Sequence, residues 1–153
     1  MDVRPFRDGD ALSLFQVFYS SVHDIAYRDY APEQIDAWAP AETDMAKWSE
    51  RMRHLAPFVV EADDVAIAYA DLQPTGYIDH FYVTGAYSRR GAGRLLMAAI
   101  HEKAHRCDIA VLTSDVSRTA QPFFAYFGFD VVEQRSVEIR GVVVPNASMR
   151  KLL

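Results

Sequence analysis

The sequence predicts an α/β fold with a mixed central sheet flanked by helices, in a single domain that spans residues 1–153. The first observation is a change of period. Apolar residues recur every three to four positions in the first third, whereas later segments are rich in β-branched and aromatic residues. The second is that strands and helices alternate in the rest of the chain, as in α/β proteins. The third is the length, because 153 residues suit one domain with its own core.

The first third of the chain is expected to be mainly helical after a short extended opening, VRPF. Asp8 or Asp10 can cap a first helix. Its apolar residues recur at helical spacing: Leu14, Phe15, Phe18, Val22 and Ile25. The segment YAPEQIDAW begins a second helix with Pro32 near its first position, where proline is favoured. Thr43 or Asp44 can cap a third helix.

The remaining elements alternate between strands and helices. PFVVEA and VAIAYADLQ are predicted strands joined by a turn at Asp63–Asp64, and GYIDHFYV is the next strand, the fourth of the chain. A helix then precedes the fifth strand, DIAVLT. In the following helix Pro122 lies in the first turn, and Gly128 ends it. Two strands joined at Arg140–Gly141 complete the chain.

Composition limits the classes of partner. The formal net charge of −5 and the lack of a basic block argue against a nucleic-acid binder. Cys107 is the single cysteine, so no intramolecular disulfide can form. No apolar run has the length of a membrane span, and the polar start MDVRPFRDGD does not resemble a signal peptide. We therefore expect a cytoplasmic protein without a membrane partner, and a homodimer is left open.

The segment HEKAH matches the H-E-x-x-H motif, in which two histidines one helical turn apart share a zinc ion. In this chain the motif residues are His101, Glu102 and His105. At about 100° per residue, the two histidines face away from the apolar side of their helix and toward solvent. No third ligand is evident downstream. We therefore expect no metal, and a zinc hydrolase is only a remote alternative.

The start of the same helix, SRRGAGR, has the features of an anion site. The first N–H groups of a helix lack internal acceptors and attract phosphate oxygens. Gly91 and Gly93 let an anion approach the backbone, and Arg89, Arg90 and Arg94 add positive charge. Neither a G-K-[ST] triplet nor G-x-G-x-x-G is present, which disfavours an NTP-binding loop and a dinucleotide fold. The alternative is a flexible loop before a helix.

Two signatures resemble the GNAT superfamily of acetyl-CoA-dependent N-acetyltransferases. YSRRGAGRLLMAAIHEKA after IDHFYV is similar to the family's motif A, and SRTAQPFFAYFGFDVV is similar to its second signature. The segments YRDYAPEQIDAWAP and EIRGVVVPNASMRKLL extend the resemblance, toward the small bacterial YafP-like subgroup, over nearly the whole chain. It implies the GNAT fold, with a V-shaped splay between the fourth and fifth strands, and acetyl-CoA as cosubstrate.

The resemblance also implies roles for individual residues. Backbone groups of Phe81, Tyr82 and Val83 would pair with the pantetheine arm of the cosubstrate. Ser117 would touch the pantetheine, and Phe123 and Phe124 would line the splay near the thioester. The pyrophosphate would be held by the turn and the first helical residues, which are Ser88, Arg89, Arg90, Gly91, Ala92, Gly93 and Arg94.

Two positions depart from the family pattern. Ser88 stands where glutamine or arginine is usual, which matters little because binding there is mainly through the backbone. Phe124 stands where the family often has a tyrosine that protonates the leaving thiolate, and phenylalanine cannot donate a proton. Ser117 is one alternative donor, and water is another. A non-catalytic acyl-CoA-binding or sensing module of the same fold is therefore a rival interpretation.

The expected reaction is direct attack of a small-molecule amine on acetyl-CoA in a ternary complex. The amine must lose a proton, so a base is needed, and Asp79 and His80 lie on the strand beside the expected thioester. Adjacent strand residues face opposite sides unless a bulge intervenes. In the family the acceptor pocket forms from the first helices, and its candidate residues here are His23, Tyr27, Tyr30 and Trp38.

Overall fold

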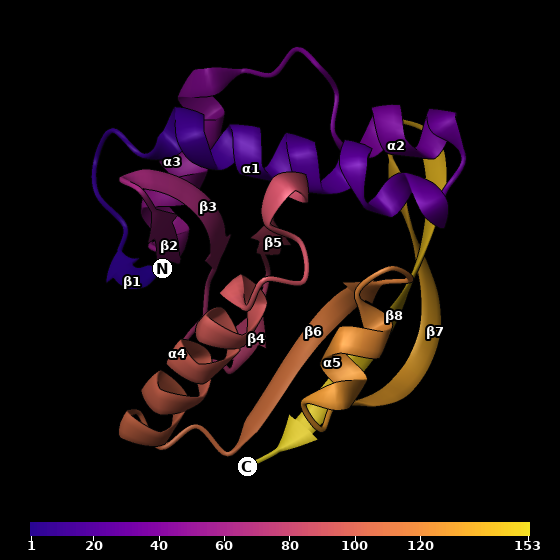
Figure 1. The fold of residues 1–153 in the computed structure, drawn as a ribbon. Coiled ribbons are helices and arrows are strands. Elements are labelled where there is room, and N and C mark those ends of the chain that lie inside the picture. The colour runs from indigo at the N-terminus through magenta and orange to yellow at the C-terminus, as the bar shows by residue number, and fades with distance from the viewer.

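The computed structural model describes residues 1–153 and contains two four-stranded sheets (Figure 1). The first sheet is antiparallel and has the strand order β1 (Asp2–Pro5), β2 (Phe58–Ala62), β3 (Val65–Ala70) and β5 (Phe81–Val83). The second has the order β4 (Tyr77–Ile78), β6 (Val111–Ser117), β8 (Val142–Leu152) and β7 (Asp130–Ile139). Its β4–β6 pair is parallel and the others are antiparallel, so the expected mixed arrangement is confirmed.

The sheets are joined and covered by five α-helices and two short 3₁₀ segments. The α-helices are α1 (Ala11–Asp24), α2 (Pro32–Trp38), α3 (Met45–Leu55), α4 (Ala92–Arg106) and α5 (Gln121–Tyr126). The 3₁₀ segments are η1 (Ala26–Arg28) and η2 (Gly85–Tyr87). Helices α1 and α3 lie on one side of the first sheet and α4 lies on the other (Figure 1). No helix is long and apolar enough to cross a membrane.

The predicted fourth strand is in fact two strands that belong to different sheets. β4 pairs with β6 through Tyr77–Thr113 and Ile78–Ser114, whereas β5 pairs with β3. The buried Ser114 hydroxyl donates to the Ile78 carbonyl at 2.7 Å, at the last β4–β6 pair. The chain then changes sheet at Asp79–His80, so that β5 and β6 diverge. The V-shaped splay between the predicted fourth and fifth strands is thereby confirmed.

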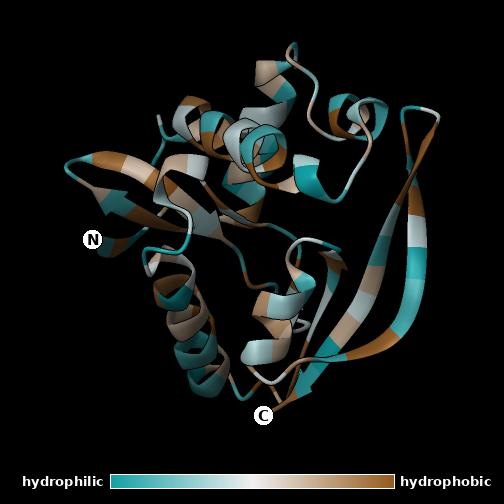
Figure 2. Cartoon of the chain, turned by 45° about the vertical axis from the view of Figure 1, so that its right-hand side comes forward, coloured by the Kyte–Doolittle hydropathy of each residue, from teal (hydrophilic) through white to brown (hydrophobic).

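Two apolar clusters pack on opposite faces of the first sheet. The helices α1 and α3 cover a face that carries Tyr69 and Val59, and α4 covers a face that carries Ala68 and Val60. This division follows from the sequence, because successive strand residues point to opposite faces. Hydrophilic and hydrophobic residues follow one another along the β7–β8 hairpin (Figure 2), and its turn end lies beside α2, where the Arg140 guanidinium donates to the Ala37 carbonyl. β7 is the edge of its sheet and is exposed along nearly its whole length.

Most of the local signals behave as predicted. Asp44 caps α3, since its Oδ1 accepts hydrogen bonds from the N–H groups of Ala46 and Lys47 at 3.1 and 3.2 Å. The expected turn at Asp63–Asp64 has both residues at positive φ, 51° and 63°. Asp10 precedes α1, but its side chain makes no capping bond. Its carboxylate instead receives two 2.8 Å hydrogen bonds from the Arg4 guanidinium.

Candidate active site

The turn before α4 and the first three residues of that helix present six consecutive backbone N–H groups, from Arg89 to Arg94, that make no hydrogen bond within the chain. Arg89 has φ 61° and Gly91 has φ 95°, so left-handed residues interrupt the turn. Successive N–H groups in such a turn form a concave nest for anions. The helix macrodipole adds partial positive charge at the same point. The turn therefore has the geometry of a nest that could hold an anion, and its role as a phosphate cradle stays a prediction.

The two glycines of this turn are required for different reasons. A Cβ at Gly91 would meet only the Met1 methyl carbon, at 3.8 Å, so its positive φ is what demands glycine. A Cβ at Gly93 would lie 3.0 Å from Cζ of Phe123. Gly93 therefore allows Phe123 of α5 to pack against the first turn of α4. The space above Gly91 is free, as a bulky anion would need.

The arginines around the turn have separate surroundings. The Arg90 guanidinium lies 5.5 Å from the ring centre of Tyr87, and that of Arg94 lies 5.6 Å from the ring centre of Tyr126. Arg94 also donates to the Tyr126 hydroxyl at 3.4 Å, which lowers the pKa of that tyrosine. No hydrogen bond or ion pair holds the exposed Arg89 side chain. Arg94 thus links α4 to α5, whereas Arg89 is free to meet an anion.

The outer edge of β5 carries free backbone groups at alternate residues. The Asp71 N–H donates to the His80 carbonyl at 3.2 Å, and the Thr84 N–H donates to the Ile67 carbonyl at 2.8 Å. Hydrogen-bonded and non-hydrogen-bonded residue pairs alternate along an antiparallel ladder. The pair between these two bonded ones is Tyr69–Tyr82, so the N–H and C=O of Tyr82 both bond to β3. Phe81 and Val83 point theirs away from β3. The expectation for Tyr82 is therefore corrected, and two residues rather than three offer free groups.

Asp79 and His80 form a bulge held from behind by a residue that was not predicted from the sequence. Oδ1 of Asp71 accepts the N–H of Asp79 at 2.9 Å and the N–H of His80 at 2.7 Å. Asp71 itself is fully buried at the end of β3. Two consecutive N–H groups therefore point at one atom, which a regular strand does not allow. The bulge keeps both Asp79 and His80 in consideration as a base.

One arginine of α3 joins the two side chains. Nη2 of Arg51 lies 2.6 Å from Oδ2 of Asp79, and Nε of Arg51 donates to Nε2 of His80 at 3.3 Å. Since a guanidinium only donates, Nε2 of His80 is an acceptor. The proton of the neutral ring is then on Nδ1, which lies 3.0 Å from the Tyr69 hydroxyl. The basic nitrogen of His80 thus faces Arg51 and Asp79.

Burial keeps the His80 ring uncharged at neutral pH. The side chain is 8% exposed, and four aromatic rings surround it, those of Phe18, Trp48, Tyr69 and Tyr82. Desolvation lowers the pKa of His80 to about 4, with a raising contribution from Asp79 and a lowering one from Arg51. Burial also raises the pKa of Tyr69 and of Tyr82. His80 is therefore an unprotonated, hydrogen-bond-accepting base at physiological pH.

The comparisons with known proteins agree with this geometry. A sequence model described as "Acetyltransferase (GNAT) domain" matches residues 26–153. The chain is 32% identical to the N-acetyltransferase YafP of Escherichia coli (strain K12) over 98% of this chain and 95% of that protein. The chain belongs to the GNAT acetyltransferase family.

Solved structures extend the comparison to the whole GNAT fold. A GCN5-related N-acetyltransferase from Rhodopseudomonas palustris superposes with a TM-score of 0.95 at 31% identity, over 99% of this chain and 95% of that one. YncA of Salmonella typhimurium, solved with acetyl-CoA, has a TM-score of 0.71 at 19% identity. The match covers 100% of this chain and 94% of the YncA chain. PaiA of Thermoplasma acidophilum, in complex with coenzyme A, has a TM-score of 0.74 at 17% identity. The match covers 99% of this chain and 98% of PaiA.

The second GNAT signature forms the end of β6 and the whole of α5. The Ser117 hydroxyl oxygen accepts the Ala120 N–H at 3.2 Å, and its own proton has no acceptor. Phe123 is half-buried between α4 and Phe81. Phe124 is 2% exposed and packs on Phe81 and Phe129, so it is a core residue. The roles of Ser117 and Phe124 near a thioester stay predictions.

Of the four acceptor candidates of this GNAT chain, two already use their polar atoms. His23 Nε2 lies 2.7 Å from the Ala39 carbonyl oxygen, and the ring stacks on Tyr19. Tyr30 is buried, and its hydroxyl donates to the Pro145 carbonyl at 2.6 Å and accepts from the Arg118 N–H at 2.9 Å. These contacts indicate structural roles for His23 and Tyr30.

The other two candidates differ in exposure. Tyr27 is 54% exposed, and the guanidinium of its neighbour Arg28 lies over its ring. Trp38 is half-buried and lies between Tyr30 and Tyr82, with ring centres 5.5 and 6.4 Å away. Tyr82 in turn contacts the His80 ring. Trp38 is therefore the candidate that the structure connects to His80, through Tyr82.

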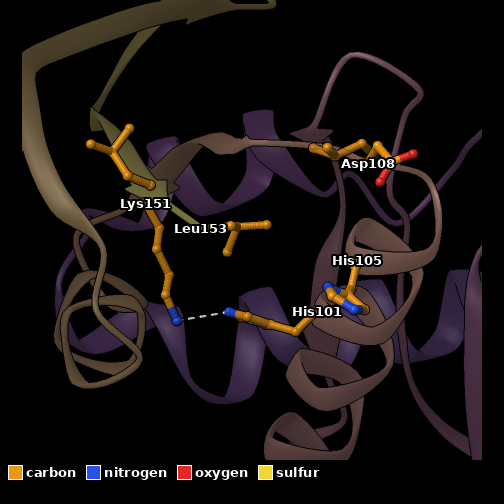
Figure 3. A pocket seen from close by; sticks show the side chains of 7 residues that line it. His101, His105, Asp108, Lys151 and Leu153 are labelled. Carbon is orange, nitrogen blue, oxygen red and sulfur yellow. Dashed lines mark hydrogen bonds between the residues drawn. The ribbon is translucent and has the colours of Figure 1, made fainter.

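The histidines of HEKAH lie far along α4, beside the C-terminal strand, and line a surface pocket of about 610 Å³ (Figure 3). His101 is half-buried rather than fully solvent-facing as predicted, because Lys151 of β8 packs against it. Its Nδ1 bonds the Met97 carbonyl at 2.7 Å, and its Nε2 accepts from Nζ of Lys151 at 2.8 Å. No group of three potential metal ligands is assembled in the structure.

Two residues of the candidate site, Asp71 and Arg51, were not predicted from the sequence. Asp71 follows six residues of strand, VAIAYA, in which no residue is charged. A carboxylate directly after such a buried strand requires hydrogen-bond partners, and this signal was available. Arg51 had no comparable signal, because one arginine on an exposed helix face is ordinary. Its partners are 28 and 29 positions away in the chain.

Proposed function

We propose that the chain transfers an acetyl group from acetyl-CoA to the amine of a small-molecule acceptor by direct attack in a ternary complex. The observation that carries the proposal is the continuity of two binding surfaces. The free edge of β5, at Phe81 and Val83, leads through a short segment to the six free N–H groups around the start of α4. A ligand with an amide-bearing arm and a pyrophosphate matches this order of groups.

The pyrophosphate would lie on the N–H groups of Arg89 to Arg94, with the Arg89 side chain as a mobile counter-charge. Ser88 directly precedes these residues. Ala92 and Gly93 are the first two residues of α4 and contribute its first N–H groups. The pantetheine amides would pair with the free groups of Phe81 and Val83 as an added strand. Ser117, the last residue of β6, would touch this arm from the other side of the splay. Complexes of YncA with acetyl-CoA and of PaiA with coenzyme A support this choice of cosubstrate.

His80 is proposed as the general base, with Asp79 as the group that holds Arg51. The acceptor nitrogen attacks the acetyl carbonyl, and its proton passes to Nε2 of His80. The carbon–sulfur bond then breaks, and the thiolate takes a proton from Ser117 or from water. Since Nε2 bonds the Arg51 Nε at 3.3 Å, Arg51 has to shift before the amine can reach it. Half of the Arg51 side chain is exposed, so such a shift is sterically open.

The surroundings of His80 favour an aromatic or cationic amine as the acceptor. Phe18, Trp48 and Tyr82 place their ring centres 5.5 to 6.3 Å from that of His80. Aromatic faces attract cations and stack with flat apolar groups. The Asp79 carboxylate is 28% exposed beside them and supplies negative charge. Trp38 extends the aromatic surface through Tyr82.

Calorimetric titration with acetyl-CoA tests the cosubstrate site, using wild type, Gly91→Glu and Gly141→Glu. Both glycines have positive φ, 95° and 78°, and neither position is sterically crowded. The two variants thus carry similar backbone strain, but Gly141 is at the β7–β8 turn, remote from α4 (Figure 1). We expect Gly91→Glu to abolish binding and Gly141→Glu to retain it. Failure of the folded wild type to bind acetyl-CoA would overturn the proposal.

Turnover separates an enzyme from a sensing module of the same fold. Release of free coenzyme A is measured with a panel of aromatic, cationic and aliphatic amines at saturating acetyl-CoA. We expect turnover with at least one aromatic or cationic amine, and a loss of about 10²-fold or more in kcat for His80→Gln. Tight binding of acetyl-CoA without turnover of any amine would favour the non-catalytic module.

A further inference from the structure

Asp71 is a buried carboxylate that lies directly behind Asp79 and His80, the two candidate catalytic residues. It is the first residue after β3 and is fully buried. Its Oδ1 receives the consecutive N–H groups of Asp79 and His80, and its Oδ2 receives the Gln73 side-chain amide at 2.7 Å. Burial raises the pKa of Asp71, which shows that a carboxylate is costly there. An ionisable group is nevertheless placed behind the two candidate catalytic side chains.

The two hydrogen bonds determine where those side chains point. In a regular strand Asp79 and His80 would face opposite sides of the sheet. Here both N–H groups point at one oxygen. The chain pairs with β6 as far as Ile78 and with β3 from Phe81 onward, so Asp79 and His80 lie between the two sheets. As a result, the Asp79 carboxylate and the His80 ring reach the same guanidinium, that of Arg51.

We propose that Asp71 is a positioning residue for acetyl transfer, whose carboxylate holds the Asp79–His80 bulge and thereby aims the base at the acceptor. The inference rests on the proposed function, and it adds a residue outside the contact surface of either substrate. The groups that face the His80 ring are Arg51 and Trp48 from α3, Phe18 from α1, and Tyr69 and Tyr82 from β3 and β5. Asp71 contacts only the backbone of His80.

Three variants isolate the hydrogen bonds to Oδ1. Asp71→Asn keeps a carbonyl oxygen for both N–H groups, and the Gln73 amide can rotate to face the new NH₂ group. Asp71→Ala removes the acceptor. Gln73→Ala is the matched control, because it removes only the partner of Oδ2. All three are compared with wild type in kcat and KM for each substrate, at a temperature where each variant is folded.

We expect Asp71→Asn and Gln73→Ala to retain kcat within about threefold, since an oxygen of residue 71, amide or carboxylate, still accepts both N–H groups. Asp71→Ala is expected to lower kcat by at least about tenfold, with little change in KM for acetyl-CoA. A second readout is the titration of the His80 ring by nuclear magnetic resonance. It should follow a pKa of about 4 in wild type and Asp71→Asn, and move toward the ordinary value in Asp71→Ala.

Several results would overturn the inference. A folded Asp71→Asn that loses kcat tenfold would show that the acceptor oxygen is not what matters, and this test stands even if Asp71→Ala does not fold. An Asp71→Ala variant with the kcat and His80 titration of wild type would do the same. If wild type turns over no amine, the proposed function fails, while the His80 titration still decides whether Asp71 sets the geometry of the bulge.

Discussion

Nη2 of Arg51 lies 2.6 Å from Oδ2 of Asp79, so an ion pair ties α3 to the point where the two sheets divide. The Arg51 side chain is 52% exposed, and exposed pairs contribute little to stability because water competes for both partners. The pair is therefore easily opened. Arg51 also occupies Nε2 of His80, so in the proposed reaction the acceptor would have to displace it.

Removal of Arg51 should make His80 more basic. Desolvation is the main cause of the lowered His80 pKa, and the Arg51 charge adds to it, so Arg51→Ala is expected to raise that pKa. The acid limb of the pH profile of kcat/KM for the amine should then move to higher pH. At pH 7 we expect kcat/KM to fall roughly twofold to fivefold through lost placement of Asp79.

The matched control for this change is Arg53→Ala on the same helix. Arg53 is similarly exposed and pairs only with the exposed Asp8, at 3.7 Å. Its removal should leave both the acid limb and kcat/KM as in wild type. An unshifted limb in Arg51→Ala, or the same shift in both variants, would contradict the arrangement described above.

Stability should fall as the solution becomes acidic, in part because of His80. The folded chain resists protonation of this ring until about pH 4, whereas the unfolded chain binds the proton near pH 6.5. The stabilisation is therefore complete above about pH 6.5 and is lost as the pH falls toward 4. A shift of this size corresponds to about 3 kcal/mol at most.

Urea unfolding of wild type and His80→Gln at pH 7, 5.5 and 4.5 measures this contribution as a difference. Other acidic groups act in both proteins and cancel. Asp71 is one of them, and its raised pKa works in the opposite direction, since stability falls as the pH rises through it. The fall in the free energy of unfolding should be smaller in His80→Gln. Equal falls would mean that His80 is not buried as described.

Tyr30→Phe should lower stability rather than acceptor affinity. The hydroxyl links the segment before α2 to Pro145 of β8 and to Arg118, and its removal leaves two partly buried backbone groups without their partner. We expect a loss of about 1–3 kcal/mol in the free energy of unfolding, with KM for the amine unchanged. Tyr27→Phe is the control, since its hydroxyl makes no hydrogen bond and the side chain is 54% exposed. A raised KM without loss of stability would return Tyr30 to the acceptor site.

Chelators should not affect the reaction. Both nitrogens of His101 are engaged, one by the Met97 carbonyl and one by Lys151, and Glu102 pairs with Arg106 at 2.8 Å. We expect the purified protein to contain no stoichiometric zinc and to keep its activity in EDTA. One zinc ion per chain, together with loss of activity on chelation, would revive the hydrolase interpretation of HEKAH.

Features set by neighbouring residues were predictable from the sequence. The cap at Asp44, the Asp63–Asp64 turn and the glycine-rich start of α4 each depend on a few consecutive residues. A bulge at Asp79–His80 was left open by the sequence, but the residue that holds it was not predicted. The Asp71 contacts span 8 and 9 positions and cross a change of sheet, which no periodicity encodes.

Which backbone groups of β5 are free could not be predicted from the sequence either. The sequence identified the strand, but which of its residues point outward depends on register with β3. A shift of one residue would have exposed Tyr82 in place of Phe81 and Val83. That choice is made by the chain as a whole. Similarly, the polar atoms of His23 and Tyr30 are used by carbonyl groups 16 and 115 positions away.

The bulge at Asp79–His80 is anchored through main-chain N–H groups, and its shape therefore does not depend on which side chains stand at these two positions. Substitution there would change the chemistry presented at the proposed acetyl-transfer site, while the two N–H groups stay held by Asp71. For protein engineering this makes residues 79 and 80 an exchangeable pair. A library confined to them samples new bases, acids and nucleophiles on an intact frame.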